Sequence, residues 1–145
     1  MGFVFSRQTG RIHLINSRNV HMATDLWTPL RQDRRLVRVL RLVNHDMTKR
    51  PTLTEAASTA GLEKTYFSTY FRREVGCSFM EWSSRVRVEH ARRLLTERRG
   101  PISHVAAAVG YDDMTTFERN FRKYCGVTPR QYRQQFRKRV ADSNT

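Results

Sequence analysis

The stretch Phe67–Gly76, which reads FSTYFRREVG, decides the fold because its pattern returns fifty residues later. The later stretch, Phe117–Gly126, reads FERNFRKYCG, so two aromatic residues, an arginine and a glycine keep their spacing. An aromatic residue follows each stretch at the same offset, Trp82 after the first and Tyr132 after the second. A repeat of this size predicts two copies of one supersecondary unit.

The repeat also extends toward the N-terminus of each stretch. Small and apolar residues match there at an offset of forty-nine, so the second copy holds one additional residue after its glycine. A single extra residue belongs in a turn, and each copy therefore reads as helix, turn, helix. The matched residues are Leu53, Ala56, Ala57, Ala60, Gly61 and Leu62 in the first copy and Ile102, Val105, Ala106, Val109, Gly110 and Tyr111 in the second.

Local signals predict where the helices of each copy begin and end. Thr52 and Glu55 form a capping box at the start of the first helix, and Gly61 supplies the left-handed backbone that ends it. The second helix of this copy is expected to start near Glu63. In the second copy, Asp112 is the expected N-cap of the corresponding helix.

Helical periodicity separates a buried face from an exposed face on the second helix of each copy. The inward positions are apolar or aromatic, namely Phe67, Tyr70, Phe71 and Val75, then Phe117, Phe121 and Tyr124. The outward positions are polar or charged, namely Thr65, Ser68, Thr69 and Arg72, then Thr115, Glu118, Arg119 and Arg122. The same kind of surface is thus predicted twice.

The other periodic segments complete an all-α architecture of about seven helices, in which a long connector helix joins two helix-turn-helix subdomains. Apolar spacing predicts a helix within Asp33–Asp46, and Thr128-Pro129 is the expected start of a last helix through Gln131–Lys138. Near the N-terminus, Phe3–Phe5 and Ile12–Ile15 are candidate short strands. The predicted divisions are an extension of unknown role (1–30), the first subdomain (33–78), the connector (79–99), the second subdomain (101–138) and a tail (139–145).

Charge limits the classes of partner. The 145 residues include 27 Lys and Arg against 13 Asp and Glu, a net charge of +14 that favours polyanions. No apolar run is long enough to span a membrane and no signal peptide is evident, so we expect a cytoplasmic protein with no membrane partner. Cys77 and Cys125 lack metal-site spacing and the five histidines are scattered. We therefore predict no metal, no cofactor and no enzymatic activity.

Residues 33–138 resemble the C-terminal DNA-binding region of the AraC/XylS family of bacterial transcription regulators. The second copy carries the most specific part of the resemblance, in Ile102–Ala106, Val109–Asp112, Phe117–Tyr124, Gly126–Pro129 and Tyr132-Arg133. The looser first copy keeps Ala57, Gly61, Phe71 and Gly76. The resemblance implies a transcription regulator that offers two recognition helices to successive major-groove segments of double-stranded DNA. Activation is the expected direction of regulation, and the bacterial nucleoid is the expected location.

Most members of that family carry a larger effector-binding or oligomerisation domain before this region. Two interpretations stay open: a short stand-alone regulator, or a chain whose residues 1–30 are the end of a lost domain.

The duplicated outer face supplies the candidate DNA contacts. Hydroxyl groups form hydrogen bonds with base edges or phosphates, Arg donates two hydrogen bonds to guanine, and Glu accepts one from cytosine N4. The predicted base-contacting residues are Thr65, Ser68, Thr69, Thr115, Glu118 and Arg119. Basic residues on and beside these faces are predicted to bind phosphate, namely Lys64, Arg72, Arg73, Arg122 and Lys123.

Other functions and partners remain open. A non-specific architectural DNA- or RNA-binding role is the main alternative, because charge alone attracts any nucleic acid. DNA-alkylation repair proteins carry a similar region, but their chemistry belongs to an added cysteine-rich domain. Solubility is the first interpretation of an arginine-rich helix face, and a phosphate contact or docking of RNA polymerase are the alternatives; the face comprises Arg34, Arg35, Arg38 and Arg41. Because one chain carries two unequal recognition helices, we expect a monomer on an asymmetric site.

Overall fold

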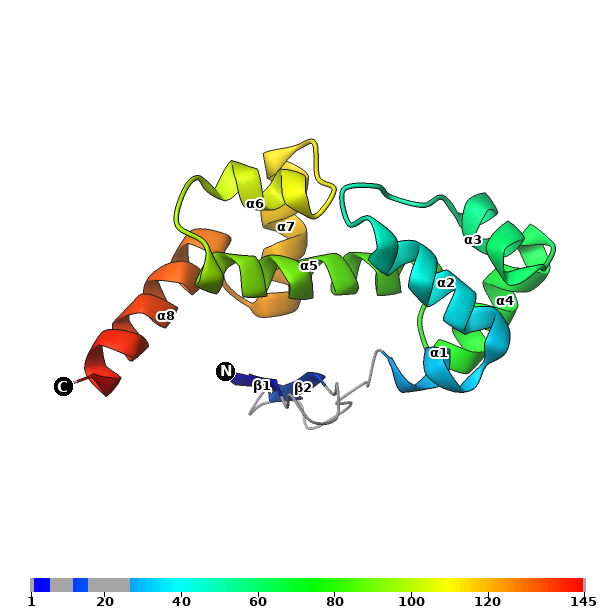
Figure 1. The fold of residues 1–145 in the computed structure, drawn as a ribbon, viewed down its shortest axis with the longest axis horizontal. Helices are drawn as coiled ribbons and strands as arrows, with labels where there is room; N and C mark the ends of the chain where they lie inside the picture. Colours follow the sequence, from blue (N-terminus) through cyan, green and yellow to red (C-terminus); the bar gives the residue numbers. More distant parts are fainter. Residues whose placement is uncertain (1, 6–11, 16–26, 145) are drawn as a thin grey trace. The chain divides into compact units, whose positions relative to one another are not determined.

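The computed structural model describes residues 2–5, 12–15 and 27–144, with side chains from residue 27 onward. Two strands and eight helices lie in these ranges (Figure 1). In chain order they are β1 (Gly2–Phe5), β2 (Ile12–Ile15), α1 (Thr28–Gln32), α2 (Arg34–His45), α3 (Leu53–Ala60), α4 (Lys64–Val75), α5 (Phe79–Glu97), α6 (Ile102–Ala108), α7 (Met114–Cys125) and α8 (Pro129–Ser143).

The predicted all-α class and the long connector helix are confirmed. α5 has nineteen residues, a length of about 28 Å at the usual rise per residue. The candidate strands are also present, because β1 and β2 pair in antiparallel fashion with Phe3 opposite Leu14. The remainder of the N-terminal extension, residues 6–11 and 16–26, lies outside the described residues.

The structure differs from the prediction in two details of helix number and length. A short additional helix, α1, raises the number from seven to eight in the described ranges; its first turn contains Pro29, and Leu30 is buried. The last helix also continues to Ser143 instead of ending at Lys138. No Gly or Pro interrupts residues 130–143, so residues 139–143, expected as a tail, remain helical.

The chain divides into two compact units, which are described separately. Unit 1 comprises residues 1–44 and 51–82, and unit 2 comprises residues 45–50 and 83–145. The division passes through α5, between Trp82 and Ser83, about one turn beyond the boundary expected from the sequence. Residues 45–50 follow α2 in the chain and yet group with unit 2.

Aromatic rings from α4 and α5 form the centre of unit 1. Phe71 lies edge-on to both Phe79 and Trp82, with ring centroids 5.6 Å apart in each pair. Phe67 is also fully buried. α2 and α3 add buried aliphatic side chains, namely Leu36, Val39, Val43, Ala56, Ala57 and Ala60. Burial of each large side chain contributes roughly 1.5–3 kcal/mol, so this core holds α4 with its other face outward.

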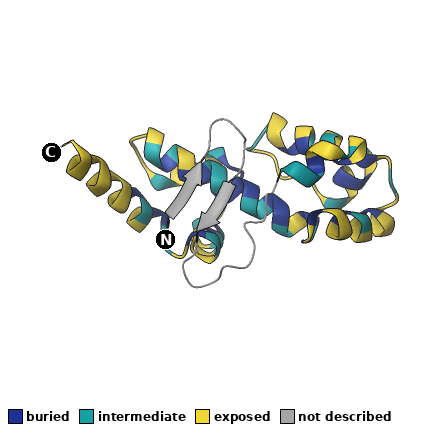
Figure 2. Ribbon diagram, turned by 90° about the horizontal axis from the view of Figure 1, so that it is seen from below, coloured by how far each residue is buried: buried dark blue, intermediate teal, exposed yellow. Residues whose placement is uncertain are grey.

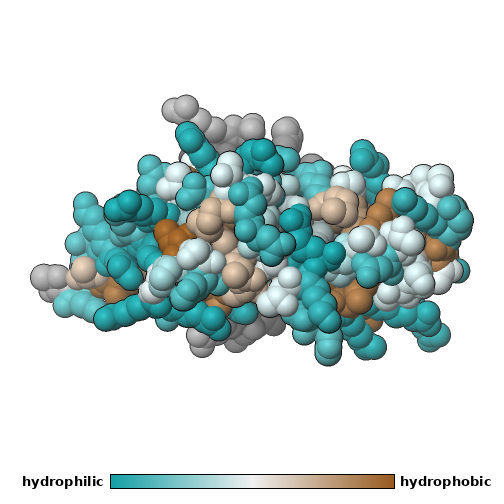
Figure 3. All heavy atoms as spheres, turned by 90° about the horizontal axis from the view of Figure 1, so that it is seen from above, coloured by the Kyte–Doolittle hydropathy of each residue, from teal (hydrophilic) through white to brown (hydrophobic). Residues whose placement is uncertain are grey.

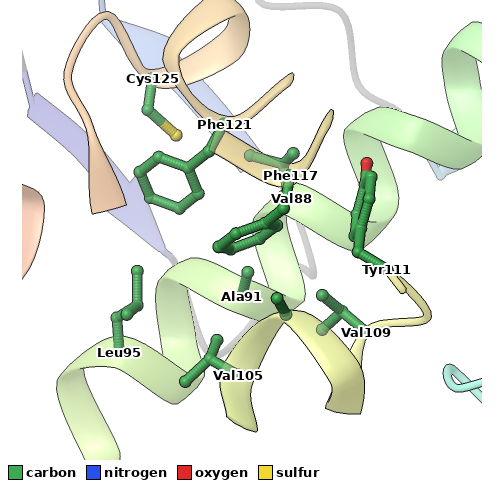
Figure 4. Close-up of a cluster of buried hydrophobic side chains, with 10 residues drawn as sticks. Val88, Ala91, Leu95, Val105, Val109, Tyr111, Phe117, Phe121 and Cys125 are labelled. Atoms are coloured by element: carbon green, nitrogen blue, oxygen red, sulfur yellow. The ribbon is translucent and has the colours of Figure 1, made fainter. Parts of the chain in front are cut away.

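Unit 2 has a second core built on the same plan, shown in Figure 4. Phe117 and Phe121 of α7 are fully buried, and their ring centroids are 5.8 Å apart. Tyr111, in the turn before α7, packs against Phe117 with centroids 5.3 Å apart. The surrounding buried side chains are Val88, Ala91, Leu95, Val105, Ala106, Val109 and Cys125.

Arg133 joins α8 to the end of α5. Its guanidinium donates to the carbonyl oxygens of Leu95 and Gly100 at 3.4 and 2.5 Å, so it occupies acceptors that the helix end leaves open. Beyond Arg133, α8 is exposed (Figure 2), including Phe136 and Val140. Among the helices of the described ranges, none has the length and apolar character needed to cross a membrane.

Candidate nucleic-acid interface

α4 begins at a carboxylate cap. The Glu63 carboxylate accepts hydrogen bonds from the backbone amides of Thr65 and Tyr66 at 2.9 and 3.0 Å. These bonds hold the pKa of Glu63 below its usual value, and they satisfy amides that the first helical turn leaves without partners. The predicted start near Glu63 is therefore confirmed, and the cap sets where the exposed face of α4 begins.

α7 begins at Asp113, and the prediction that Asp112 is its cap was wrong. The Asp113 carboxylate accepts from the Thr116 hydroxyl at 2.6 Å and from the Thr116 amide at 2.8 Å. The repeat explains this correction. After the inserted turn residue the two copies are offset by fifty, so the counterpart of the Glu63 cap in the second copy is Asp113. Asp112 is exposed and lies in the turn that holds the insertion.

The structure exposes every side chain predicted to contact DNA. Phe67 and Phe71 anchor α4, and Phe117 and Phe121 anchor α7, so the opposite faces of both helices remain on the surface. Hydrophilic side chains predominate on the molecular face shown in Figure 3. The exposed residues are Lys64, Thr65, Ser68, Thr69, Arg72 and Arg73 on α4 and Thr115, Glu118, Arg119, Arg122 and Lys123 on α7.

The basic residues differ in how far they are already engaged. Nε of Arg73 lies 3.1 Å from a carboxylate oxygen of Glu74, and this hydrogen bond raises the pKa of Arg73. Nζ of Lys123 lies 5.2 Å from the centre of the Tyr124 ring. Met114, the first residue of α7, packs against the core of unit 2.

Sequence reasoning missed Tyr66 on the α4 surface. Its side chain is 52% exposed, and its ring stacks on Tyr70 with centroids 5.9 Å apart. The hydroxyl of Tyr70 donates to the Asp33 carboxylate. Tyr66 lies directly beside Thr65 in the chain, but attention to the i, i+3, i+4 positions passed over it.

Sequence reasoning also missed Arg50, which lies close to the second repeat although it precedes the first in the chain. Its guanidinium carbon lies 4.9 Å from the centre of the Tyr111 ring, within unit 2. The Tyr111 hydroxyl accepts from the amide nitrogen of Asn120, on α7, at 3.2 Å. No local sequence signal connects these three residues.

Comparisons with known proteins agree with this arrangement. A family model described as a helix-turn-helix domain matches residues 56–135. The arabinose operon regulatory protein of Escherichia coli (strain K12) is 32% identical over 90 residues, which are 62% of this chain and 31% of that protein. The lactose operon transcription activator of Staphylococcus xylosus is 29% identical over 94 residues, 65% of this chain and 34% of that protein.

A solved structure shows the same fold. The DNA-binding domain of AdpA, a global transcriptional factor crystallised with a target DNA, has a TM-score of 0.67 at 24% identity. The similarity covers 77% of this chain and 95% of that one. Several curated relatives are much longer proteins, of which the chain spans 13% to 38%. Since the matching family model covers residues 56–135 of 145, the chain belongs to the AraC/XylS family of helix-turn-helix transcription regulators.

Proposed function

We propose that this chain is a sequence-specific double-stranded DNA-binding transcription regulator that uses α4 and α7 as its two recognition helices. The observation that carries the proposal is the duplicated exposed face. Each face is polar or charged, starts at a carboxylate cap and lies opposite two buried phenylalanines. A surface that only kept the protein soluble would not need the same register in both copies.

The two faces differ in chemistry. α4 offers the hydroxyls of Thr65, Ser68 and Thr69, which bond base edges or phosphates with little discrimination. α7 offers Glu118 and Arg119, which discriminate cytosine and guanine more sharply. The second copy is therefore the more selective reader. Lys64, Arg72, Arg73, Arg122 and Lys123 hold the helices against phosphates.

Two unequal faces in one chain allow a monomer to read an asymmetric site, since both half-site contacts come from the same polypeptide. Gene activation is the preferred outcome, because the similar Staphylococcus xylosus protein is a transcription activator. A contact with RNA polymerase would use the exposed arginines of α2, for which solubility and a phosphate contact are the alternatives. These arginines are Arg34, Arg35, Arg38 and Arg41.

The proposal is tested by in vitro selection of binding sites from random duplexes. Arg119→Ala should cost about 1–3 kcal/mol on the selected site and relax the preference at one base position. Arg122→Ala is the matched control, because it removes the same charge from the same helix, one residue beyond the buried Phe121. The control should weaken all sequences to a similar degree and leave the consensus unchanged.

Different outcomes separate the alternatives. Failure of wild type to enrich any consensus, or equal competition by random duplex or RNA, would support a non-specific architectural role instead. An Arg119→Ala protein that selects the wild-type consensus with uniformly weaker binding would make Arg119 a phosphate contact. A palindromic consensus occupied by two protein chains would contradict the proposal that a monomer reads an asymmetric site.

A further inference from the structure

The loop of residues 45–50 is held in unit 2 by a buried arginine. Arg87, on α5, has no exposed surface. Its guanidinium donates to the carbonyl oxygens of Met47 and Lys49, at 2.6 and 2.5 Å, and to that of Val109, at 3.1 Å. Val109 lies at the end of α6, so one side chain ties the loop to the turn of the second repeat. Hydrogen bonds from a charged donor are stronger than neutral ones, and the loop is therefore firmly placed.

A glycine in that turn permits the close approach. Gly110 has a φ of +81°, and a Cβ added there would lie 2.7 Å from the Met47 carbonyl oxygen and 3.0 Å from that of Thr48. Within the loop, the Asp46 carboxylate accepts from the Thr48 amide at 3.0 Å. The backbone of the loop is thus in contact with the turn that leads into α7.

This anchoring places a cation beside α7. Arg50, the last residue of the loop, is exposed and covers the buried ring of Tyr111 at 4.9 Å. Tyr111 in turn is bonded to Asn120, which flanks the outer face of α7 that carries Arg119. Among the described residues, none offers a carboxylate paired with Arg50. Its charge is therefore available to an anion.

The corresponding position in unit 1 has different neighbours. Tyr70 is the counterpart of Asn120 at the offset of fifty, and its hydroxyl donates to the carboxylate of Asp33. Arg73, on α4 itself, also lies over the Tyr70 ring at 5.3 Å. The flank of α4 thus has an acidic neighbour and a guanidinium from its own helix, whereas the guanidinium beside Tyr111 comes from the loop of residues 45–50.

We propose that Arg50 is a DNA-backbone clamp for the second recognition helix, binding a phosphate beside the segment that α7 reads. The assignment rests on the proposed function, and it adds a contact from outside both repeats. A planar guanidinium held by stacking keeps its donors oriented, which suits phosphate better than a mobile lysine does. Arg50 therefore adds affinity and fixes position without selecting bases.

The test measures how DNA affinity depends on salt for wild type, Arg50→Ala and Arg50→Lys. Arg139→Ala is the matched control, since it removes one exposed arginine from the same unit, on the distal part of α8. Each protein is titrated with the selected site and with a random duplex between 50 and 200 mM salt. Ethylation interference on the selected site locates the phosphates in contact. Unchanged thermal unfolding verifies that each variant is folded.

Loss of one phosphate contact lowers the slope of log K against log salt by about one. Between 50 and 200 mM salt, the affinity of the variant should therefore fall by a factor that is roughly fourfold smaller than the fall for wild type. We expect that change for Arg50→Ala on both duplexes, with the consensus unchanged and interference lost at a phosphate beside the α7 half-site. Arg50→Lys should retain the slope.

A slope for Arg50→Ala equal to that of wild type, or lowered no more than in Arg139→Ala, overturns the clamp. The random duplex keeps the two proposals separable. Failure of wild type to enrich a consensus removes sequence-specific regulation, while the slope on random duplex still decides whether Arg50 binds phosphate.

Discussion

Replacing Gly110 by alanine tests how strongly the close approach of loop 45–50 supports unit 2. Gly61 is the matched control, because its φ of +72° resembles the +81° of Gly110 while no atom lies within 4 Å of a Cβ added to Gly61. Both substitutions place an alanine in the left-handed region, at a cost of about 1–2 kcal/mol. Any difference between the two losses of stability measures the contact between the Gly110 turn and loop 45–50.

The additional cost at Gly110 follows from two overlaps. The new Cβ would lie 2.7 Å from the Met47 carbonyl oxygen and 2.8 Å from Nη1 of Arg87. One of these groups must move, which weakens at least one hydrogen bond from the buried guanidinium, worth about 1.5–3 kcal/mol. Gly110→Ala should therefore lower the free energy of unfolding by about 2.5–5 kcal/mol, against about 1–2 kcal/mol for Gly61→Ala.

The assay must report on each unit separately. Trp27 and Trp82 both belong to unit 1, so tryptophan fluorescence during urea unfolding measures the stability of unit 1 in Gly61→Ala. Native-state hydrogen exchange at the amides of α6 and α7 follows Gly110→Ala. Equal losses of stability for the two alanines would refute the reasoning, because the loop contact would then contribute nothing beyond the backbone conformation.

Three further predictions concern the phosphate contacts, a helix cap and a thiol. Replacing Lys64, Arg73, Arg122 and Lys123 together by alanine should lower the salt slope of DNA binding by about four, as measured by fluorescence anisotropy; an unchanged slope removes these assignments. Asp113→Ala should lower the urea concentration at which the protein unfolds, because the Thr116 amide and hydroxyl lose their acceptor. The Thr116 hydroxyl lowers the pKa of Asp113 in the folded state, so the stabilisation by the Asp113 carboxylate is present at neutral pH and lost as pH falls below about 4. The stability of Asp113→Ala should therefore decrease less steeply with falling pH than that of wild type. An equally steep decrease in the variant would contradict the cap. Burial raises the pKa of Cys125 to about 12, so this thiol should resist a disulfide reagent at pH 8 until urea is added; rapid modification in Cys77→Ser without urea would show that it is accessible.

The core and the two exposed faces were readable from the chain because local periodicity encodes them. Phe67, Phe71, Phe117 and Phe121 recur at helical spacing, and all four are buried. The capping box at Thr52 is also present, with both of its reciprocal hydrogen bonds. Such signals lie within a few residues of each other, where backbone geometry alone decides which side chains meet.

Errors arose where local signals competed. Asp112 and Asp113 are adjacent carboxylates, and either suits an N-cap by residue type. The inserted residue in the turn decided between them, and the repeat offset already contained that information. The end of α8 was underestimated because few apolar residues mark it, although nothing in residues 139–143 breaks a helix.

The placement of loop 45–50 had no local signal at all. Residues 45–50 precede the first repeat in the chain, while their partners Arg87, Gly110 and Tyr111 lie about forty to sixty residues later. The amino-acid order therefore determined the two repeats, their caps and their outward faces through contacts between near neighbours. The folded chain decided that a guanidinium from before the first repeat covers Tyr111 beside α7, because a buried arginine and a glycine without a Cβ bring distant backbone segments together.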